Sequence, residues 1–569
     1  MSSAPEIEHP STTVPLRTQA REAIRRAWST AIDAGSLPAL PSDTAAPEVE
    51  IERPAHMEHG DLSTNLAMKL ARPYRQAPMT IAAAIVDRLT TGATNDAAVT
   101  PIARAEPAPP GFINLWLADH ALEATVDAVI ERPMDWGRVT PIRPRKVNVE
   151  FVSANPTGPL TIGNARGAFV GDLLCRILQA GGQTVAREYY FNDAGAQVQR
   201  LGESVLAVRD GRPIPDDGYH GDYVSDLAND VPLELLSDAG LASTADAVGR
   251  WATDRVRAGI EASLERLGVH FDTWTTETRL HTEGWVGRAV DRLRDHGYIY
   301  EQDGALWFRS TEFGDDKDRV VIRSNGQPTY FAADIGYITE KFSRGFDHLI
   351  YIWGADHHGT VARVRNAATA MGYDADAVQV LLYSWVHFVR DGVEVSMSKR
   401  SGEFITLDEL LAEVGVDAAR WFFASRSPNT GIDFDIELAK KQSNENPVYY
   451  VQYAHARIAS ILRKAAETGL QPANSVAGYL GGAPEAALAR ALARLPEVVE
   501  DAVWSEETQG VTAFATELAT TFHAFYRDAR VVDPDRPELS AARLALVSAT
   551  RTTIANALHL LGISAPESM

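Results

Sequence analysis

The sequence predicts an α/β protein with a parallel sheet at its centre, a smaller α+β region before the sheet and an all-helical region after it. An apolar strand at residues 147–152 leads through a Gly/Pro turn into a helical run at 163–180, and a second strand follows at 184–191. Gly181 and Gly182 close the helical run as a C-cap. From residue 446 onward the pattern is helical, and Pro484 stands where a first-turn proline would open one of the helices.

Breaks in the pattern divide the chain into three predicted domains, because a chain of 569 residues is too long for one core. The predicted domains are residues 1–135, residues 136–440 with an insertion at about 202–275, and residues 441–569. A proline-rich stretch at 133–144 is the expected linker between the first two. The elements expected in them are helices at 18–34, 80–89, 485–495 and 544–561, and strands at 49–51, 111–117, 304–308, 319–322 and 348–353.

The composition is that of a soluble protein. Hydrophobic residues make up 45% of the chain, yet no apolar run approaches the roughly 20 residues that span a bilayer. The first residues lack the basic start and apolar core of a secretory signal, so we expect no membrane partner and a cytoplasmic protein. Cys175 is the only cysteine, which excludes an internal disulfide, and we interpret it as a small buried apolar residue.

The formal net charge of −22 argues against general binding of polyanions. Any contact with nucleic acid must therefore be local. Each basic cluster also fits a solvated helix face when taken alone. The candidate clusters are Arg17, Arg21, Arg25 and Arg26; Arg143, Arg145 and Lys146; and Arg457, Arg463 and Lys464.

Two motifs far apart in the chain predict one site for a nucleotide. The first, Thr-Ile-Gly-Asn at 161–164, opens the helix that follows the first central strand. A helix start offers unpaired N–H groups and a positive dipole end to a phosphate. The second, Ser-Met-Ser-Lys-Arg at 396–400, carries mobile cationic charge to the same phosphates. Together they indicate ATP chemistry.

These motifs resemble the two signatures of class I aminoacyl-tRNA synthetases, usually His-Ile-Gly-His and Lys-Met-Ser-Lys-Ser. Flanking segments narrow the resemblance to arginyl-tRNA synthetases, and it runs from residues 58–61 to 561–567. The segments that carry it are EFVSANPTGP at 150–159, YFAADI at 330–335, WGADHHG at 353–359 and NPVYYVQYAHAR at 446–457. The resemblance implies a Rossmann-type catalytic domain, an N-terminal add-on domain that meets the outer corner of tRNA, and an anticodon-binding helical bundle.

The same resemblance implies the activity. Such an enzyme activates L-arginine with ATP to arginyl-adenylate and transfers it to the 3′-terminal adenosine of tRNA(Arg) for protein synthesis. ATP would act as its Mg²⁺ complex, with no permanently bound cofactor and no metal site in the protein. The expected state is a monomer. His357 and His358 could be taken for metal ligands, but no cysteine or further histidine stands at ligand spacing.

Binding ATP requires close backbone approach and charge that faces the phosphates. Lys399 is the expected cation on the pyrophosphate side, and Asp356 would accept hydrogen bonds from the ribose hydroxyls. Thr161, Asn164 and Lys399 are the predicted catalytic residues. The predicted ATP-binding residues are Gly158, Thr161, Gly163, Asn164, Asp356, Met397, Ser398, Lys399 and Arg400. The glycines could instead serve only turns and helix packing.

Selecting arginine requires carboxylates that face a planar guanidinium. By resemblance, Glu277 and Asp334 would face the guanidinium with Tyr330 beside them, and Asp334 follows Tyr330 by one helical turn. Glu150 and Asn155 would hold the amino-acid head. The simpler alternatives are a surface acid in a Thr-rich loop for Glu277 and a core aromatic for Tyr330.

Both signatures depart from the common pattern. Thr161 and Asn164 replace the two histidines of the first signature, and Ser396 replaces the first lysine of the second. Asparagine is familiar in arginyl enzymes, and a threonine hydroxyl can still donate to a phosphate oxygen. Three hypotheses stay open: an arginine–tRNA ligase for translation, a paralogue that serves another acceptor or pathway, and a non-catalytic RNA-binding relative.

Overall fold

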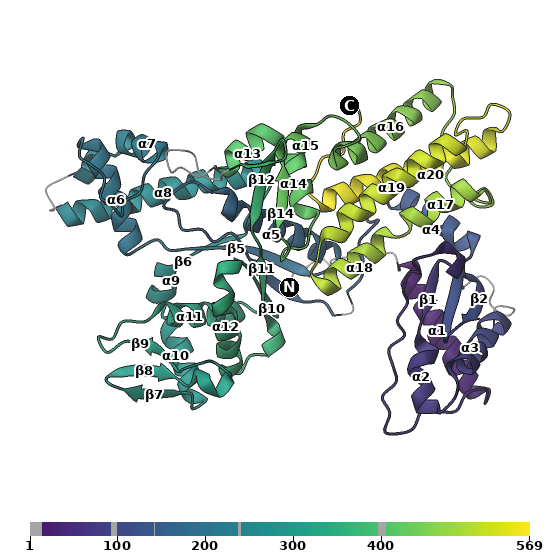
Figure 1. Cartoon of the computed structure of the whole chain (residues 1–569), viewed down its shortest axis with the longest axis horizontal. Coiled ribbons are helices and arrows are strands. Elements are labelled where there is room, and N and C mark those ends of the chain that lie inside the picture. Colours follow the sequence, from purple (N-terminus) through teal and green to yellow (C-terminus); the bar gives the residue numbers. More distant parts are fainter. Residues whose placement is uncertain (1–13, 93–99, 142, 237–240, 396–404) are drawn as a thin grey trace, which may run out of the picture.

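The computed structural model describes residues 14–92, 100–141, 143–236, 241–395 and 405–569. A parallel sheet lies near the middle of the molecule, and the first and last parts of the chain lie together at one end (Figure 1). No helix in these described ranges combines the length and the apolar character needed to cross a membrane.

The central sheet has the strand order β11-β10-β4-β5-β6, and all four pairings are parallel. The chain starts in the middle at β4, proceeds outward to β5 and β6, and then returns to the other side of β4. Open sheets of this kind bind ligands outside the carboxyl ends of the strands, at the point where the order reverses. That point lies between β4 and β10. The strands are β4 (Lys146–Glu150), β5 (Thr184–Phe191), β6 (Thr273–Thr276), β10 (His348–Gly354) and β11 (Val378–Tyr383).

Helices cover both faces of this sheet (Figure 1). Along β10, Ile350 and Ile352 join the core beneath α5 (Ile162–Ala180), whereas Leu349 and Tyr351 join the core beneath α11 (Tyr330–Ser343) and α12 (His358–Ala370). This alternation follows from the two-residue period of a strand. The structure thus confirms the predicted α/β class, the first two strands and the helix between them.

The helix α5 lies unusually close to the sheet because Gly171 has no side chain. A Cβ atom at this position would lie 2.2 Å from Cγ of Phe151. Cys175, on the same helix, is fully buried, as the sequence predicted, and burial raises the pKa of its thiol.

Between β5 and β6 the chain forms an arm of packed helices on one side of the molecule (Figure 1). The two strands expected at 304–308 and 319–322 exist, but they lie in a separate antiparallel sheet of order β7-β8-β9, outside the parallel sheet. The arm between β5 and β6 consists of α6 (Ala196–Arg209), α7 (Asp222–Asp230), η2 (Leu233–Leu236) and α8 (Leu241–Leu267). The elements that follow β6 are α9 (Glu277–Thr282), α10 (Trp285–Asp295), β7 (Ile299–Gln302), β8 (Ala305–Phe308), η3 (Ser310–Phe313) and β9 (Arg319–Ile322).

A second small sheet, of order β13-β12-β14, follows the parallel sheet and leads into helices. Thr406 and Glu409 form a capping box at the start of α13. The elements are η4 (Ala355–His357), η5 (Ala375–Ala377), β12 (Val386–Arg390), β13 (Val393–Val395), α13 (Leu407–Val414), α14 (Val416–Ala424), β14 (Ile432–Asp435) and α15 (Ile436–Lys440).

The N-terminal region packs helices on an antiparallel sheet of order β1-β3-β2. The prediction of a strand at residues 49–51 is wrong: these residues form no strand, and the adjacent Glu52 makes only an isolated bridge with Ser63. Val49 and Ile51 are buried, but Pro47 and Pro54 flank them, and proline cannot donate to a strand ladder. The elements are α1 (Leu16–Asp33), η1 (Met57–His59), β1 (Leu62–Thr64), α2 (Leu66–Tyr74), α3 (Pro78–Gly92), β2 (Ile102–Ala108), β3 (Phe112–Leu117) and α4 (Asp119–Glu131).

The C-terminal region is helical, as predicted, and it packs against both α5 and α4 (Figure 1). Pro484 stands in the first turn of its helix, which confirms its predicted role. The helices are α16 (Pro447–Glu467), α17 (Ala483–Leu492), α18 (Leu495–Ser505), α19 (Gln509–Asp528) and α20 (Pro537–Leu560).

Candidate active site

The first signature lies at the start of α5, at the carboxyl edge of the parallel sheet. Thr161 is the N-cap residue, but no side-chain hydrogen bond caps the helix. The Thr161 hydroxyl instead donates to Oδ1 of Asn164 at 2.8 Å, so the two predicted catalytic side chains of this motif are in contact. Gly163 is exposed between them. An uncapped helix start with a hydroxyl and an amide beside it suits an anionic group.

The chain that leaves the second signature is bound to the first. The N–H of Ile162 donates to the carbonyl of Ile405 at 3.2 Å, and the N–H of Leu407 donates to the carbonyl of Leu160 at 2.9 Å. Thr161 and Thr406 form an isolated antiparallel bridge. Met397, Ser398, Lys399 and Arg400 lie outside the described residues.

The turn between β4 and α5 has unusual backbone geometry. Val152 and Ser153 have φ angles of 66° and 43°, in the left-handed region that a β-branched residue rarely adopts. Strain of this kind concentrates at functional sites. The N–H of Tyr190 donates to the Ser153 hydroxyl at 3.2 Å, and this hydroxyl donates to Oε1 of Glu150 at 3.1 Å, so the strained turn is held from two sides.

Asn155 and Gly158 lie further along this turn. Asn155 is exposed, donates to Oε1 of Gln197 at 2.9 Å and accepts from the N–H of Asn192 at 3.1 Å. A Cβ atom on Gly158 would lie 3.4 Å from the hydroxyl of Tyr223. The insertion therefore contacts this turn through Tyr223 of α7.

Asp356 follows the end of β10, as predicted, and its side chain is 81% exposed. Its Oδ1 atom occupies the space that a Cβ atom on Gly354 would need, at 2.4 Å. Burial and the charge of Asp356 raise the pKa of Tyr383 to about 12. His357 lies 3.6 Å from Asp356, and the described residues contain no group of three or more side chains suited to hold a metal ion.

Two of the predicted arginine-binding acids, Glu277 and Asp334, lie near each other at one edge of the sheet. Tyr330 and Asp334 lie on α11, where Tyr330 is 74% exposed. Glu277 begins α9 and accepts from the hydroxyl of Tyr190 at 3.2 Å. Asp334 is exposed to solvent, although nearby protein atoms desolvate its carboxylate. That desolvation, with the like charges of Glu150 and Glu277, raises the pKa of Asp334 to about 7.

Glu150 differs from these acids because it is already paired. It is 5% exposed, and Lys341 of α11 donates to its Oε2 at 2.6 Å. Burial still raises the pKa of Glu150, and Lys341 opposes this shift. The cluster therefore contains one acid that is paired with a cation, Glu150, and two acids, Glu277 and Asp334, with no lysine or arginine of the described chain within ion-pair distance. The ring of His281 lies 3.7 Å from Glu277.

Sequence reasoning missed four residues of this site, namely Tyr190, Glu188, Lys341 and Arg166. Arg166 of α5 is buried without an acidic partner among the described residues. Its guanidinium donates to the carbonyls of Ser384, Trp385, Ser427 and Thr430 at 2.7–3.1 Å. Burial lowers the pKa of Arg166 to about 10. Only its position one turn after the first signature could have drawn attention to it.

The candidate RNA-binding clusters are differently placed. Arg17 forms ion pairs with Glu500 and Asp501 of α18, so it joins two parts of the protein. Arg457 lies over the rings of Tyr453 and Tyr526. Arg21, Arg25, Arg26, Arg143, Arg145, Arg463 and Lys464 remain candidates for RNA contact.

Comparisons with known proteins agree with this geometry. Three family models match the chain: "Arginyl tRNA synthetase N terminal domain" at residues 18–117, "tRNA synthetases class I (R), catalytic domain" at 255–435 and "DALR anticodon binding domain" at 451–569. The parallel sheet and the signature at the start of α5, with the catalytic-domain match, define a class I tRNA synthetase.

Similar curated proteins show which family of class I tRNA synthetases the chain belongs to. An arginine–tRNA ligase from Geobacter sp. strain M21 is 46% identical over 92% of this chain and 95% of its own length. One from Geobacillus kaustophilus is 44% identical over 97% of this chain and 99% of its own. The chain belongs to the arginyl-tRNA synthetase family. The Thermus thermophilus arginyl-tRNA synthetase structure shares the fold, with a TM-score of 0.72 and 24% identity, over 96% of this chain and all of that chain.

Proposed function

We propose that this protein is an arginine–tRNA ligase that forms arginyl-adenylate from L-arginine and ATP and transfers arginine to the 3′-terminal adenosine of tRNA(Arg). The observation that carries the proposal is the convergence of Glu277 and Asp334 beside Tyr190 at the carboxyl edge of the sheet. Two carboxylates without a strong cationic partner suit a guanidinium, which offers five donors in a planar fork.

The nucleotide would lie at the reversal point between β4 and β10. In this proposal Thr161, Gly163 and Asn164 face the phosphates, Gly158 allows close backbone approach, and Asp356 accepts from the ribose. Lys399 would neutralise charge on the leaving pyrophosphate, with Met397, Ser398 and Arg400 beside it. Mg²⁺ would enter with the ATP phosphates, and no resident cofactor is proposed.

The carboxylate of arginine attacks the α-phosphorus of ATP, and pyrophosphate leaves with the electron pair of the broken P–O bond. The site contributes mainly alignment and charge stabilisation. Asn155 is exposed at the turn and is proposed to bind the amino-acid head. We propose that Glu150 also lies near the amino-acid head. Because Lys341 already pairs with Glu150, its role is to orient charge there more than to contact the substrate directly.

The protein is proposed to act in the cytoplasm, because translation requires charged tRNA where the ribosomes are. It is also proposed to be a monomer. The proposed domains remain 1–135, 136–440 and 441–569. Light scattering during size-exclusion chromatography would test the monomer, and a mass of two chains would contradict it.

A charging assay with arginine, ATP and total tRNA tests the activity. We expect arginine to be incorporated and the 2′-hydroxyl to be the acceptor. Thr161→Val, which replaces the hydroxyl with a methyl group of similar size, should lower kcat with little change in arginine KM, and Lys399→Ala should lower kcat further. Failure of the wild type to charge any tRNA would favour a paralogue with another acceptor.

A further inference from the structure

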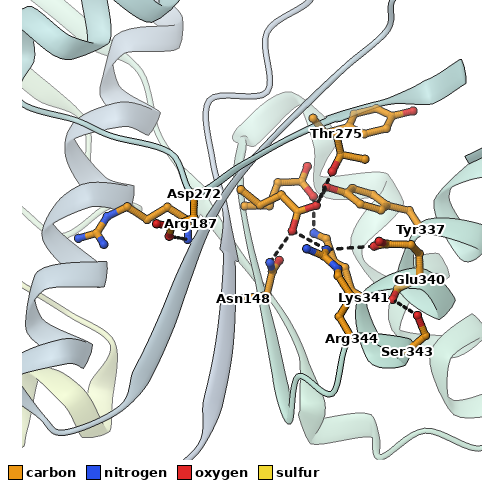
Figure 2. Close-up of polar contacts among 12 residues, drawn as sticks. Asn148, Arg187, Asp272, Thr275, Tyr337, Glu340, Lys341, Ser343 and Arg344 are labelled. Carbon is orange, nitrogen blue, oxygen red and sulfur yellow. Dashed lines mark hydrogen bonds and ion pairs between the residues drawn. The ribbon is translucent and has the colours of Figure 1, made fainter. Parts of the chain in front are cut away.

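Glu188 of β5 is the most completely buried acid near the active site, with 0% exposure, and the reaction proposed above does not use it. Four side chains donate to its two oxygens (Figure 2). Oε1 accepts from the hydroxyls of Thr275 and Tyr337, both at 2.7 Å. Oε2 accepts from Nδ2 of Asn148 and Nη2 of Arg344, both at 2.6 Å.

The four donors come from elements that carry, or directly precede, the acids proposed to recognise arginine. Asn148 lies on β4, two residues before Glu150. Thr275 lies on β6, two residues before Glu277. Tyr337 and Arg344 belong to α11 and its C-cap, and Tyr337 follows Asp334 by three residues. One carboxylate therefore connects the supports of all three acids.

The face of α11 that meets the sheet explains this arrangement. Asp334, Tyr337 and Lys341 repeat at intervals of three and four residues, so they lie in one row along the helix. Tyr330 and Arg344 extend the row at its two ends. The first two members of the row are proposed to meet arginine, and the last three bind Glu188 or Glu150.

The charges around Glu188 are balanced. Glu150 and Glu188 are register partners on adjacent strands, and both are buried. Lys341 pairs with Glu150, and Arg344 pairs with Glu188 and with Glu340 at 3.0 Å. Burial opposes ionisation, but Lys341, Arg344 and the hydroxyl donors lower the pKa of Glu188 to about 2, so it is ionised at neutral pH.

We propose that Glu188 is a positioning residue for arginine recognition, which holds β4, the β6–α9 junction and α11 so that Glu150, Glu277 and Asp334 converge on the substrate. The inference rests on the proposed function. Glu188 itself does not touch arginine, because no part of it reaches solvent. Its effect on arginine is carried by the three elements that it connects.

Glu188→Gln tests the role with a side chain of the same shape. The amide removes the negative charge that pairs with Arg344. Its NH₂ either faces Asn148 and Arg344, donor against donor, or faces Thr275 and Tyr337, whose hydroxyls must then turn to accept. We expect the KM for arginine to rise roughly tenfold and the KM for ATP to stay within about twofold. Calorimetric titration with arginine, which needs neither tRNA nor turnover, should show the same weakening.

Asp172→Asn is the matched control. Asp172 is equally buried on α5, which lies on the opposite face of the sheet, and it pairs with Arg176 at 2.7 Å and with Arg420 at 2.9 Å. Its loss should lower the melting temperature without changing arginine KM or affinity. A purely structural role for Glu188 would make the two variants behave alike, and that result would overturn the proposal.

Tyr337→Phe decides the question if Glu188→Gln does not fold, because it removes only one hydroxyl donor. We expect a rise of severalfold in arginine KM, smaller than for Glu188→Gln; a KM equal to that of the wild type would overturn the proposal. Wild-type protein that binds arginine but charges no tRNA would count against the proposed function alone, since the calorimetric comparison of variants would still hold.

Discussion

At the scale of single residues, the acids of the site differ in the charges that lie next to them. Glu150 faces Lys341, whereas Asp334 faces only the like charges of Glu150 and Glu277 among its close charged neighbours. An acid in this position is costly to ionise until a cation arrives. A guanidinium would supply that cation, so arginine binding and the ionisation of Asp334 should be coupled.

The coupling predicts a pH dependence. Because the pKa of Asp334 is raised to about 7, the carboxyl is largely neutral at lower pH and attracts a guanidinium weakly. We expect kcat/KM for arginine to rise by up to about tenfold per pH unit below that pKa, then to level off above it. Rates over a pH series at saturating ATP measure this. Asp334→Asn should lower kcat/KM and flatten the rise; an unchanged slope would assign it to another group.

The same shift predicts an effect on stability. A carboxyl whose pKa is raised on folding favours the folded state at low pH, and this contribution is lost as the pH rises toward about 7. Asp334→Asn removes the penalty. The melting temperature of the variant relative to the wild type should therefore increase from about pH 4 to about pH 7 and then level off. A constant difference would mean that Asp334 is no harder to ionise in the folded protein than in the unfolded chain.

At the scale of elements, the position of α5 on the sheet determines where the first signature lies. Gly171 allows that position, because it faces Phe151 directly after β4. The strained turn at Val152 begins at the next residue. Helix, strand and turn are therefore one packed unit, and a change in their spacing would move Thr161 relative to the strand ends.

Gly171→Ala should test this packing. The added methyl group has no space beside Phe151, and overpacking of this kind costs about 1–3 kcal/mol. We expect a lower melting temperature in a thermal unfolding assay. Gly259→Ala in the exposed part of α8 is the control, because a Cβ there meets nothing within 4 Å, and helix propensity should make it neutral or stabilising. Equal melting temperatures for the two variants would contradict the tight contact.

At the scale of the whole molecule, the two ends of the chain form one unit beside the catalytic sheet (Figure 1). Arg53 donates through Nε and Nη2 to both carboxylate oxygens of Glu497, at 2.9 and 3.0 Å. Arg490 pairs with Asp61 at 2.8 Å, and Val476 donates its N–H to Asp127 at 2.8 Å. The N-terminal region is therefore held at a set angle to the helical bundle.

If both regions contact tRNA, as the family resemblance implies, that angle should affect tRNA binding. Glu497→Gln removes the charge that Arg53 requires and keeps the shape of the side chain. We expect the KM for tRNA to rise severalfold, with the KM values for arginine and ATP unchanged. Glu261→Gln is the control, because Glu261 pairs with Arg257 within α8, outside both of these regions. Equal tRNA KM values in wild type and Glu497→Gln would show that the angle does not matter.

The sequence by itself determined the local elements and the family. The strand, turn and helix around residues 147–180 were predictable, because apolar periodicity, turn glycines and the helix start are properties of neighbouring residues. The match of both signatures and their flanking segments identified the kind of enzyme. The helical spacing of Tyr330 and Asp334 was also correct, since it depends only on the 3.6-residue period.

Only the tertiary structure decided which acids are neutralised and which are open to a substrate. Nothing local to Glu150 indicates that Lys341, far along the chain, pairs with it, or that Glu188 connects β4, β6 and α11. The strands at 305–308 and 319–322 likewise lie in a sheet of their own, which their sequences do not indicate, because strand partners are determined by contacts over long separations. Charge pairing and strand pairing depend on distance in space, and a sequence records only distance along the chain.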